Sequence, residues 1–232
     1  MRVDVAFTPA EARGAPTGLV IDVIRATSTI CQALASGYSE VFCTAEIEDA
    51  RALRADLGAG VLGGERKAVR IDGFDLGNSP REYVRPLADT LILTTTNGTR
   101  AIVTTATHCD RVFVASLLNL GAIVERADEV GEDVTIVCAG IQGALAVDDA
   151  YVAGRIVEAL DCEPTDAAEV AARLAASWQG AEDAFRSSRS GRNLLENAPD
   201  LEEDLDFCAR ESVLDVVPAL AGMEGAAARI TV

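Results

Sequence analysis

Short valine-rich runs alternate with helix-like segments along most of the chain, and this alternation restricts the fold more than any other feature. Residues 18–23 form an apolar run interrupted only by Asp22, and residues 27–36 follow with helical periodicity before a stop at Gly37. The same signals predict strands at residues 1–7, 40–43, 61–62, 90–95, 111–115 and 134–139, and helices at residues 46–57, 98–107, 117–127 and 149–160. This alternation predicts a three-layer α/β/α fold with a mainly parallel or mixed sheet.

The rest of the chain shows no linker, internal repeat or low-complexity tract. Residues 161–210 are predicted to be rich in helices, and a short helix is predicted at residues 80–84. Residues 212–218 and 228–232 are predicted as late strands at the edge of the sheet. We therefore expect a single α/β domain over residues 1–232.

The chain is strongly acidic, with 37 Asp and Glu residues against 20 Lys and Arg residues and a formal net charge of −17. Such a surface repels nucleic-acid backbones and anionic lipid head groups, so we expect no nucleic-acid partner and no membrane partner. Lys67 is the only lysine. Adaptation to high salt and a GC-rich genome would each favour such a lysine-poor composition, and the sequence leaves both explanations open.

Nothing in the sequence predicts export or membrane insertion. Residues 1–7 are typical of a first strand rather than of the apolar core of a signal peptide, and no uncharged apolar run approaches the ~18 residues of a membrane helix. The six cysteines form no C-x-x-C pair and no cluster with histidine, which is typical of reduced core thiols. We expect a cytoplasmic protein.

Polar side chains gather where the predicted strands end, and this edge of an open α/β sheet is where ligands bind. The first cluster contains Asp22, Arg25, Thr27 and Ser28. The carboxylate could hold a cation, the guanidinium could bind an anion, and the helix N-terminus adds backbone donors. The alternative is purely structural, with Thr27 as an N-cap and Asp22 paired with Arg25.

Two further strand exits carry similar groups. At the first, Gly63 and Gly64 would let the backbone approach a ligand closely before Glu65 and Arg66, although these last two could also be a plain surface ion pair. At the second, donors at a helix start suit a phosphoryl or sulfonyl group, with a simple turn and N-cap as the alternative. These donors are Thr95, Thr96, Asn97, Gly98, Thr99 and Arg100.

A glycine-rich turn brings Asn78 and Ser79 in front of Pro80. Both side chains could contact a ligand at the sheet edge. They could equally cap the short helix, because proline is common at the first helical position.

Two adjacent acids, Asp148 and Asp149, open the predicted helix after the strand at residues 134–139. They could do no more than complement the helix dipole. Together with Asp22 and Glu65, however, they could form an oxygen cage for Mg²⁺, which prefers carboxylates and water.

Missing residues exclude several catalytic classes. His108 is the only histidine, which excludes a histidine-rich zinc site and a phosphatase with a histidine nucleophile and a second histidine. The chain also lacks a G-x-x-x-x-G-K-[ST] phosphate loop and a G-x-S-x-G nucleophile elbow. No cysteine precedes an arginine at the spacing of Cys-loop phosphatases.

In chain order, several segments resemble those of the 2-phosphosulfolactate phosphatase family. They are residues 20–29, 64–66, 73–80, 94–100 and 138–140. The most specific are the blocks Gly-Phe-Asp-Leu-Gly-Asn-Ser-Pro and Thr-Thr-Thr-Asn-Gly-Thr-Arg. Asp148 and Asp149 stand where family members usually carry Glu-Asp.

The resemblance implies Mg²⁺-dependent hydrolysis of a small anionic phosphorylated substrate, 2-phospho-3-sulfolactate, to sulfolactate and inorganic phosphate, a step toward coenzyme M. We expect Asp22, Arg25 and Asn97 to be catalytic, with Asp22 as the nucleophile if a covalent step exists. The expected metal ligands are Asp22, Glu65, Asp148 and Asp149. The expected substrate-binding residues are Arg25, Thr27, Ser28, Arg66, Asn78, Ser79, Thr95, Thr96, Asn97, Gly98, Thr99 and Arg100.

Two other functions stay open. One is a non-catalytic module that binds a phosphorylated or sulfonated metabolite, and the other is a Mg²⁺-dependent phosphatase for a different small phosphorylated acid. A homodimer is expected only because homodimers are common.

Overall fold

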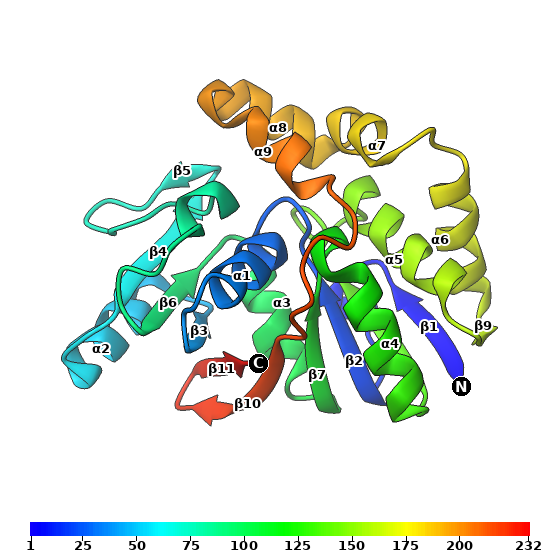
Figure 1. The fold of residues 1–232 in the computed structure, drawn as a ribbon, viewed down its shortest axis with the longest axis horizontal. Coiled ribbons are helices and arrows are strands. Elements are labelled where there is room, and N and C mark those ends of the chain that lie inside the picture. Colours follow the sequence, from blue (N-terminus) through cyan, green and yellow to red (C-terminus); the bar gives the residue numbers. More distant parts are fainter.

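The predicted alternation of strands and helices is present in the computed structural model, which describes residues 1–232 (Figure 1). The strands are β1 (Arg2–Ala6), β2 (Ala15–Ile21), β3 (Glu40–Thr44), β4 (Val61–Arg66), β5 (Val69–Arg70), β6 (Thr90–Thr94), β7 (Cys109–Ala115), β8 (Val134–Cys138), β9 (Glu163–Pro164), β10 (Ala219–Glu224) and β11 (Ala227–Thr231). The helices are α1 (Ala26–Ala35), α2 (Ile47–Leu57), α3 (Gly98–Thr105), α4 (Leu120–Val130), α5 (Val147–Ala159), α6 (Asp166–Ala176), α7 (Ala181–Ser187), α8 (Arg189–Asn197) and α9 (Glu203–Cys208).

Local signals set several helix boundaries. Gly58 ends α2 as predicted, with a φ of 67°, and Gly131 ends α4 with a φ of 66°. Both values lie in the left-handed region, where glycine avoids the steric cost of a Cβ atom. The short helix predicted at residues 80–84 is a 3₁₀ turn over Pro80–Tyr83.

All the strands belong to one 11-stranded sheet, in the order β5-β4-β6-β3-β11-β10-β7-β2-β8-β1-β9. Strands β4, β6 and β3 form one parallel group, and β7, β2, β8, β1 and β9 form a second. The hairpin β10–β11 joins the two groups through antiparallel pairings. Because all three pairings of this hairpin are antiparallel, the two groups run in opposite directions along the sheet.

The last part of the chain differs from the prediction. Residues 212–218 form no strand, and β10 and β11 lie in the middle of the sheet instead of at its edge. The amides of Val213 and Leu214 donate to the carbonyl oxygen of Leu118 and not to a neighbouring strand. An apolar pattern cannot distinguish these two kinds of partner, which is why the prediction was wrong.

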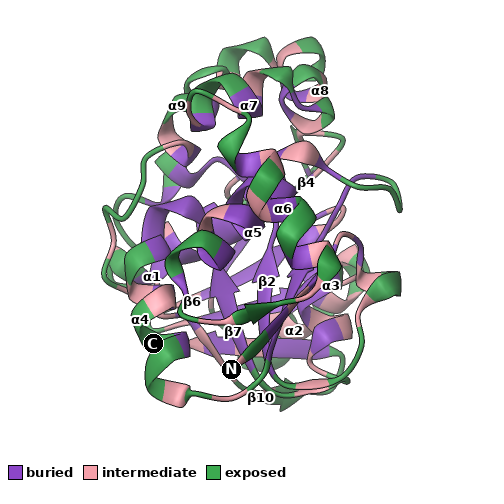
Figure 2. Ribbon diagram, turned by 90° about the vertical axis from the view of Figure 1, so that its right-hand side faces the viewer, coloured by how far each residue is buried: buried purple, intermediate pink, exposed green.

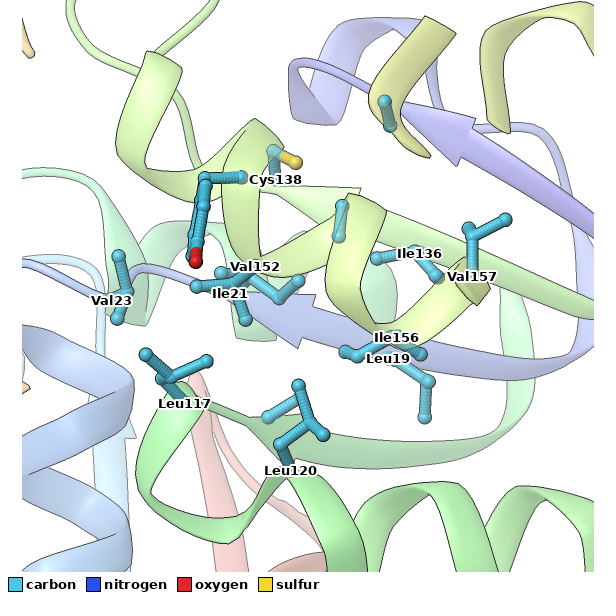
Figure 3. Close-up of a cluster of buried hydrophobic side chains, with 14 of the residues drawn as sticks. Leu19, Ile21, Val23, Leu117, Leu120, Ile136, Cys138, Val152, Ile156 and Val157 are labelled. Atoms are coloured by element: carbon cyan, nitrogen blue, oxygen red, sulfur yellow. The ribbon is translucent and has the colours of Figure 1, made fainter. Parts of the chain in front are cut away.

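Strand β2 is buried on both faces, as a central strand of an α/β sheet should be. Leu19 and Ile21 pack against Val152 and Ile156 of α5 (Figure 3). Val20 points to the opposite face and belongs to a second cluster with residues of α1 and α3. Each such side chain contributes about 1.5–3 kcal/mol when fully buried. The carboxyl end of β2 is therefore rigidly positioned between two helix layers, and Figure 2 shows the strands buried between helices with exposed outer surfaces.

The segment predicted as helix-rich contains α6, α7, α8 and α9, preceded by the two-residue strand β9. Helix α6 packs along α5, whereas α7, α8 and α9 gather at one end of the molecule, at the top of Figure 1. Of all the helices in the chain, none has both the length and the apolar composition to cross a bilayer.

Candidate active site

A cavity of about 270 Å³ lies where the two parallel groups of strands converge. Asp22 reaches it from the end of β2, Glu65 from β4, and Thr96 and Asn97 from the loop after β6. Because β2 belongs to one parallel group and β4 and β6 belong to the other, the site spans the junction between the groups. Ligands of open α/β sheets bind beyond the carboxyl ends of the strands, which is where these side chains lie.

Asp22 is buried at the end of the apolar strand β2, and its position depends on small neighbours. Its Oδ1 accepts a hydrogen bond from the Ala26 amide at 3.4 Å. A Cβ atom on Gly98 would lie 2.6 Å from Asp22 Oδ2 and 2.5 Å from the Ala26 Cβ, so residue 98 must be glycine for Asp22 to keep this place. Gly98, expected to bind substrate, therefore acts here by leaving room for the carboxylate.

The pKa of Asp22 is raised to about 7, chiefly by burial and further by the negative charges of Glu65 and Asp148. Hydrogen bonds from the Ala26 and Gly98 amides lower it by less. The raised pKa thus reflects burial first and the neighbouring carboxylates second.

Glu65 joins three segments of the site. Its carboxylate accepts hydrogen bonds from the Thr96 amide at 2.9 Å, from the Thr96 hydroxyl at 3.3 Å and from the Ala68 amide at 2.8 Å. Gly64, directly before it, has a φ of 149°, and a Cβ there would lie 2.1 Å from the Thr94 carbonyl oxygen. This glycine therefore lets β4 pair closely with β6 and sets where Glu65 emerges.

Lys67 and Ala68 form the turn between β4 and β5, with φ values of 54° and 65°. Hairpin turns with two positive φ values usually contain Asn or Gly, because a Cβ raises the energy in this region. The Ala68 amide donates to Glu65, and the Ala68 carbonyl accepts from Arg25 Nη2 at 3.4 Å. Lys67 lies on the cavity wall, a location that the sequence analysis did not assign to it.

Arg25 lines the cavity but is already paired. Its Nη1 lies 2.7 Å from Oδ2 of Asp204 in α9, and both side chains are buried. The Ser79 hydroxyl donates to Asp204 Oδ1 at 2.6 Å. Arg25 and Ser79 thus fasten α9 to the loops at the sheet edge. The alternative in which Asp22 pairs with Arg25 is not found, because Arg25 pairs with Asp204 instead. The Ile24–Arg25 peptide bond is cis.

The other two predicted arginines lie outside the cavity lining. Arg66 donates to the carbonyl oxygens of Glu65 and Ala45 and to the Thr94 hydroxyl, and its pKa is lowered mainly by burial and also by the charge of Arg100. Arg100 is exposed and pairs with Glu46 at 2.8 Å. The structure therefore does not bring these guanidinium groups to the candidate site.

Most of the predicted hydroxyl donors bind the protein itself. The Thr99 hydroxyl accepts from the Thr95 amide at 3.0 Å, while the Thr95 hydroxyl accepts from the Thr99 amide at 3.1 Å. The Thr27 hydroxyl accepts from the Asp22 amide, and the Ser28 hydroxyl donates to the Val23 carbonyl. Thr95 and Thr99 thus shape the loop that presents Thr96 and Asn97, whereas Thr27 and Ser28 shape the exit of β2. None of these four residues lines the cavity.

Asp148 and Asp149 lie behind the cavity wall. Asp149 accepts from the Val23 amide at 2.9 Å and from the Gly140 amide at 3.0 Å, so it ties the exit of β2 to the exit of β8. Its pKa is raised well above the ordinary value by burial and by the charges of Asp148 and Asp22. Burial also raises the pKa of Asp148 to about 6, and its Oδ1 has no hydrogen-bond partner.

The four predicted metal ligands are not assembled as one cage. No group of three or more His, Cys, Asp and Glu side chains is arranged to hold a metal ion. Asp22 and Glu65, however, face the cavity together, and the charge of Glu65 adds to the effect of burial in raising the pKa of Asp22. Mg²⁺ is often held by one or two carboxylates, with water and substrate phosphate completing its shell. The donor set fits a cation shared with a bound phosphate.

The opposite wall comes from α8, which lies in the segment predicted to be rich in helices but was not predicted at the site. Ser190, Asn193, Leu194 and Asn197 line the cavity from this helix. Their spacing places them on one face of the helix. A row of serine and asparagine at this spacing is visible in the sequence and could have indicated a polar helix face at a binding site. Asn78 lines the cavity from the glycine-rich turn, and its buried Oδ1 has no partner.

Buried carboxylates, one lysine and several amides thus surround a cavity the size of a small metabolite, at the carboxyl ends of the strands. This combination is typical of an α/β enzyme that acts on a small anionic compound.

The family model for 2-phosphosulpholactate phosphatase matches residues 6–222. A protein of Clostridium perfringens named probable 2-phosphosulfolactate phosphatase is 37% identical over 94% of this chain and 92% of its own length. A protein of the same name from Thermotoga petrophila is 38% identical over 94% of this chain and 95% of its own length. Another from Symbiobacterium thermophilum is 39% identical over 92% of this chain and 95% of its own length. The chain belongs to the 2-phosphosulfolactate phosphatase family.

Proposed function

We propose that this chain is a phosphoric monoester hydrolase that converts 2-phospho-3-sulfolactate and water to 3-sulfolactate and inorganic phosphate. Family membership over residues 6–222 supports this reaction. The observation that carries the proposal is the pair of carboxylates, Asp22 and Glu65, that face one small cavity from the two parallel groups of strands. Because relatives across the full length carry a phosphatase name, the non-catalytic binding module is not favoured.

In this proposal Asp22 and Glu65 define the phosphoryl end of the cavity. These two carboxylates would hold Mg²⁺, which would supply positive charge against the negative charge that develops as the bond between phosphorus and the ester oxygen breaks. Asn97 and Thr96 stand on the same wall, at the start of α3, where side-chain and backbone donors can orient phosphoryl oxygens. Arg25 contributes positive charge from the position that Asp204 fixes.

The deciding experiment measures phosphate release by the purified protein from 2-phospho-3-sulfolactate, with Mg²⁺ and with a chelator. We expect turnover that depends on the cation and is lost in Asp22→Asn, while the exposed surface variant Asp161→Asn keeps it. Tight binding of 2-phospho-3-sulfolactate without phosphate release would contradict the proposal and favour the non-catalytic binding module. Faster turnover of a phosphorylated acid that lacks the sulfonate would reassign the substrate and keep the reaction.

A further inference from the structure

The cavity contains one basic side chain that no acid neutralises. Its ionisable lining residues are Asp22, Glu65, Arg25 and Lys67. Arg25 is paired with Asp204, whereas Lys67 is exposed and takes part in no ion pair or side-chain hydrogen bond of the structure. In a chain with a net charge of −17, such an unpaired cation facing a cavity is an unusual feature.

The turn at Lys67 also contains residues that are unusual for its backbone conformation. The hairpin pairs Glu65 with Arg70 and Arg66 with Val69, so Lys67 and Ala68 alone make the turn. Both have positive φ values, at positions that usually contain residues such as Asn and Gly. Residues in such sparsely populated conformations cluster at functional sites, where the surroundings hold them.

Two site residues hold this turn. Glu65 accepts the Ala68 amide at 2.8 Å, and Arg25 donates to the Ala68 carbonyl at 3.4 Å. The same carboxylate that faces the phosphoryl end therefore also determines where the lysine stands. The position of Lys67 is thereby linked to the geometry of the site.

We propose that Lys67 binds the non-reacting anionic group of the substrate, its sulfonate or carboxylate, and so makes the enzyme prefer phosphorylated acids over simple phosphate esters. This inference rests on the proposed function. Asp22 and Glu65 repel a second anion at the phosphoryl end, so that anion needs a cation elsewhere on the wall. The ammonium group of lysine is a compact charge on a flexible stem, with three donors that suit a sulfonate or carboxylate oxygen.

The test compares three substrates: 2-phospho-3-sulfolactate, 2-phospholactate and isopropyl phosphate, which carries no second anion. For Lys67→Gln we expect kcat/KM to fall about 10- to 100-fold, mainly through KM, on the substrates whose anion Lys67 binds. Isopropyl phosphate should be hydrolysed as by the unchanged enzyme, and Lys67→Arg should recover most of the loss. Arg70→Gln is the matched control, because Arg70 lies on the same hairpin and outside the cavity lining.

The pattern of losses identifies the group that is bound. Equal losses on the two phosphorylated acids assign Lys67 to the carboxylate, and a loss on 2-phospho-3-sulfolactate alone assigns it to the sulfonate. Equal losses on all three substrates, or no loss on any, overturn the proposal.

A binding measurement separates this proposal from the proposed reaction. In isothermal titration with 3-sulfolactate, Lys67→Gln should bind about tenfold or more weakly than the unchanged protein, and Arg70→Gln should bind equally well. If the unchanged protein releases no phosphate from any ester, the proposed function fails, and this titration alone decides the role of Lys67. Equal affinity of Lys67→Gln and the unchanged protein, or no binding by the unchanged protein, overturns that role.

Discussion

The two walls of the cavity differ in charge. The wall formed by the sheet loops carries every ionisable side chain of the lining, whereas the wall formed by α8 presents one hydroxyl, two amides and a leucine. The charged groups follow strands that are fixed by the core on both faces, and the neutral groups lie on a short helix that reaches the site from a separate segment. We infer that the two carboxylates of the sheet wall support the reaction and that Lys67 and the helical wall select the molecule that reacts.

The largest expected effect comes from removing the buried ion pair that fastens α9 to Arg25 of the sheet wall. Asp204→Asn leaves Arg25 buried without its counter-charge, and we expect the free energy of unfolding to fall by about 3–5 kcal/mol. Urea unfolding measures this loss. Asp206→Asn on the same helix breaks only the exposed pair with Arg186 and should cost less than about 1 kcal/mol. Similar small losses for both variants would mean that the buried pair does not join the walls.

Removing a carboxylate from the sheet wall should affect turnover more than binding. For Glu65→Gln we expect kcat to fall on the order of 10²- to 10³-fold, because the wall loses negative charge and the carboxamide cannot accept all three hydrogen bonds that Glu65 accepts. Steady-state kinetics provides the measurement, and Glu48→Gln on the exposed surface of α2 is the control. A change confined to KM would place Glu65 with the groups that select the substrate.

Asp148 tests whether the charged region extends behind the helical wall. Its pKa is about 6 in the folded protein against 3.8 for an ordinary aspartate, so the folded state binds this proton more tightly than the unfolded state. The charged carboxylate therefore destabilises the fold as pH rises through 6, and the loss is complete well above that pH.

Asp148→Asn removes this dependence. The decrease in unfolding free energy between pH 4 and pH 8, without added divalent cation, should shrink by up to about 3 kcal/mol. The exposed variant Asp128→Asn should leave the profile unchanged. An identical pH profile for Asp148→Asn and the unchanged protein would argue that Asp148 is neutralised by a partner.

The smallest expected effect falls on the helical wall. Asn193→Ala removes one neutral hydrogen-bonding group, so we expect KM for 2-phospho-3-sulfolactate to rise about tenfold with kcat nearly unchanged. Glu196→Ala, on the exposed side of α8, should alter neither constant. A loss of kcat in Asn193→Ala as large as that in Glu65→Gln would remove the distinction between the walls.

Periodicity and glycine stops made most of the strands and helices predictable, because these signals are local. The position of the β10–β11 hairpin was not predictable, because β11 pairs with β3, a strand from the beginning of the chain. The same limit applies to α8. Its polar row is visible in the sequence, but only tertiary packing brings that row opposite Asp22.

Ligands of open α/β sheets bind where strands end, and this rule predicted four site residues that do line the cavity: Asp22, Glu65, Thr96 and Asn97. The rule cannot say where a long side chain points. Arg100 also follows a strand exit, yet its guanidinium turns outward to Glu46. Sequence reasoning therefore located the edge of the sheet better than it located the charges on that edge.

The placement of the β10–β11 hairpin also bears on the order in which the molecule folds. The two parallel groups contain strands from residues 2–164, but they are connected through a hairpin made by residues 219–231. Pairings over such long sequence separations form slowly, because a large loop must close first. Asp22 and Glu65 belong to different groups, so within the sheet the two carboxylates of the cavity are connected through the last hairpin of the chain.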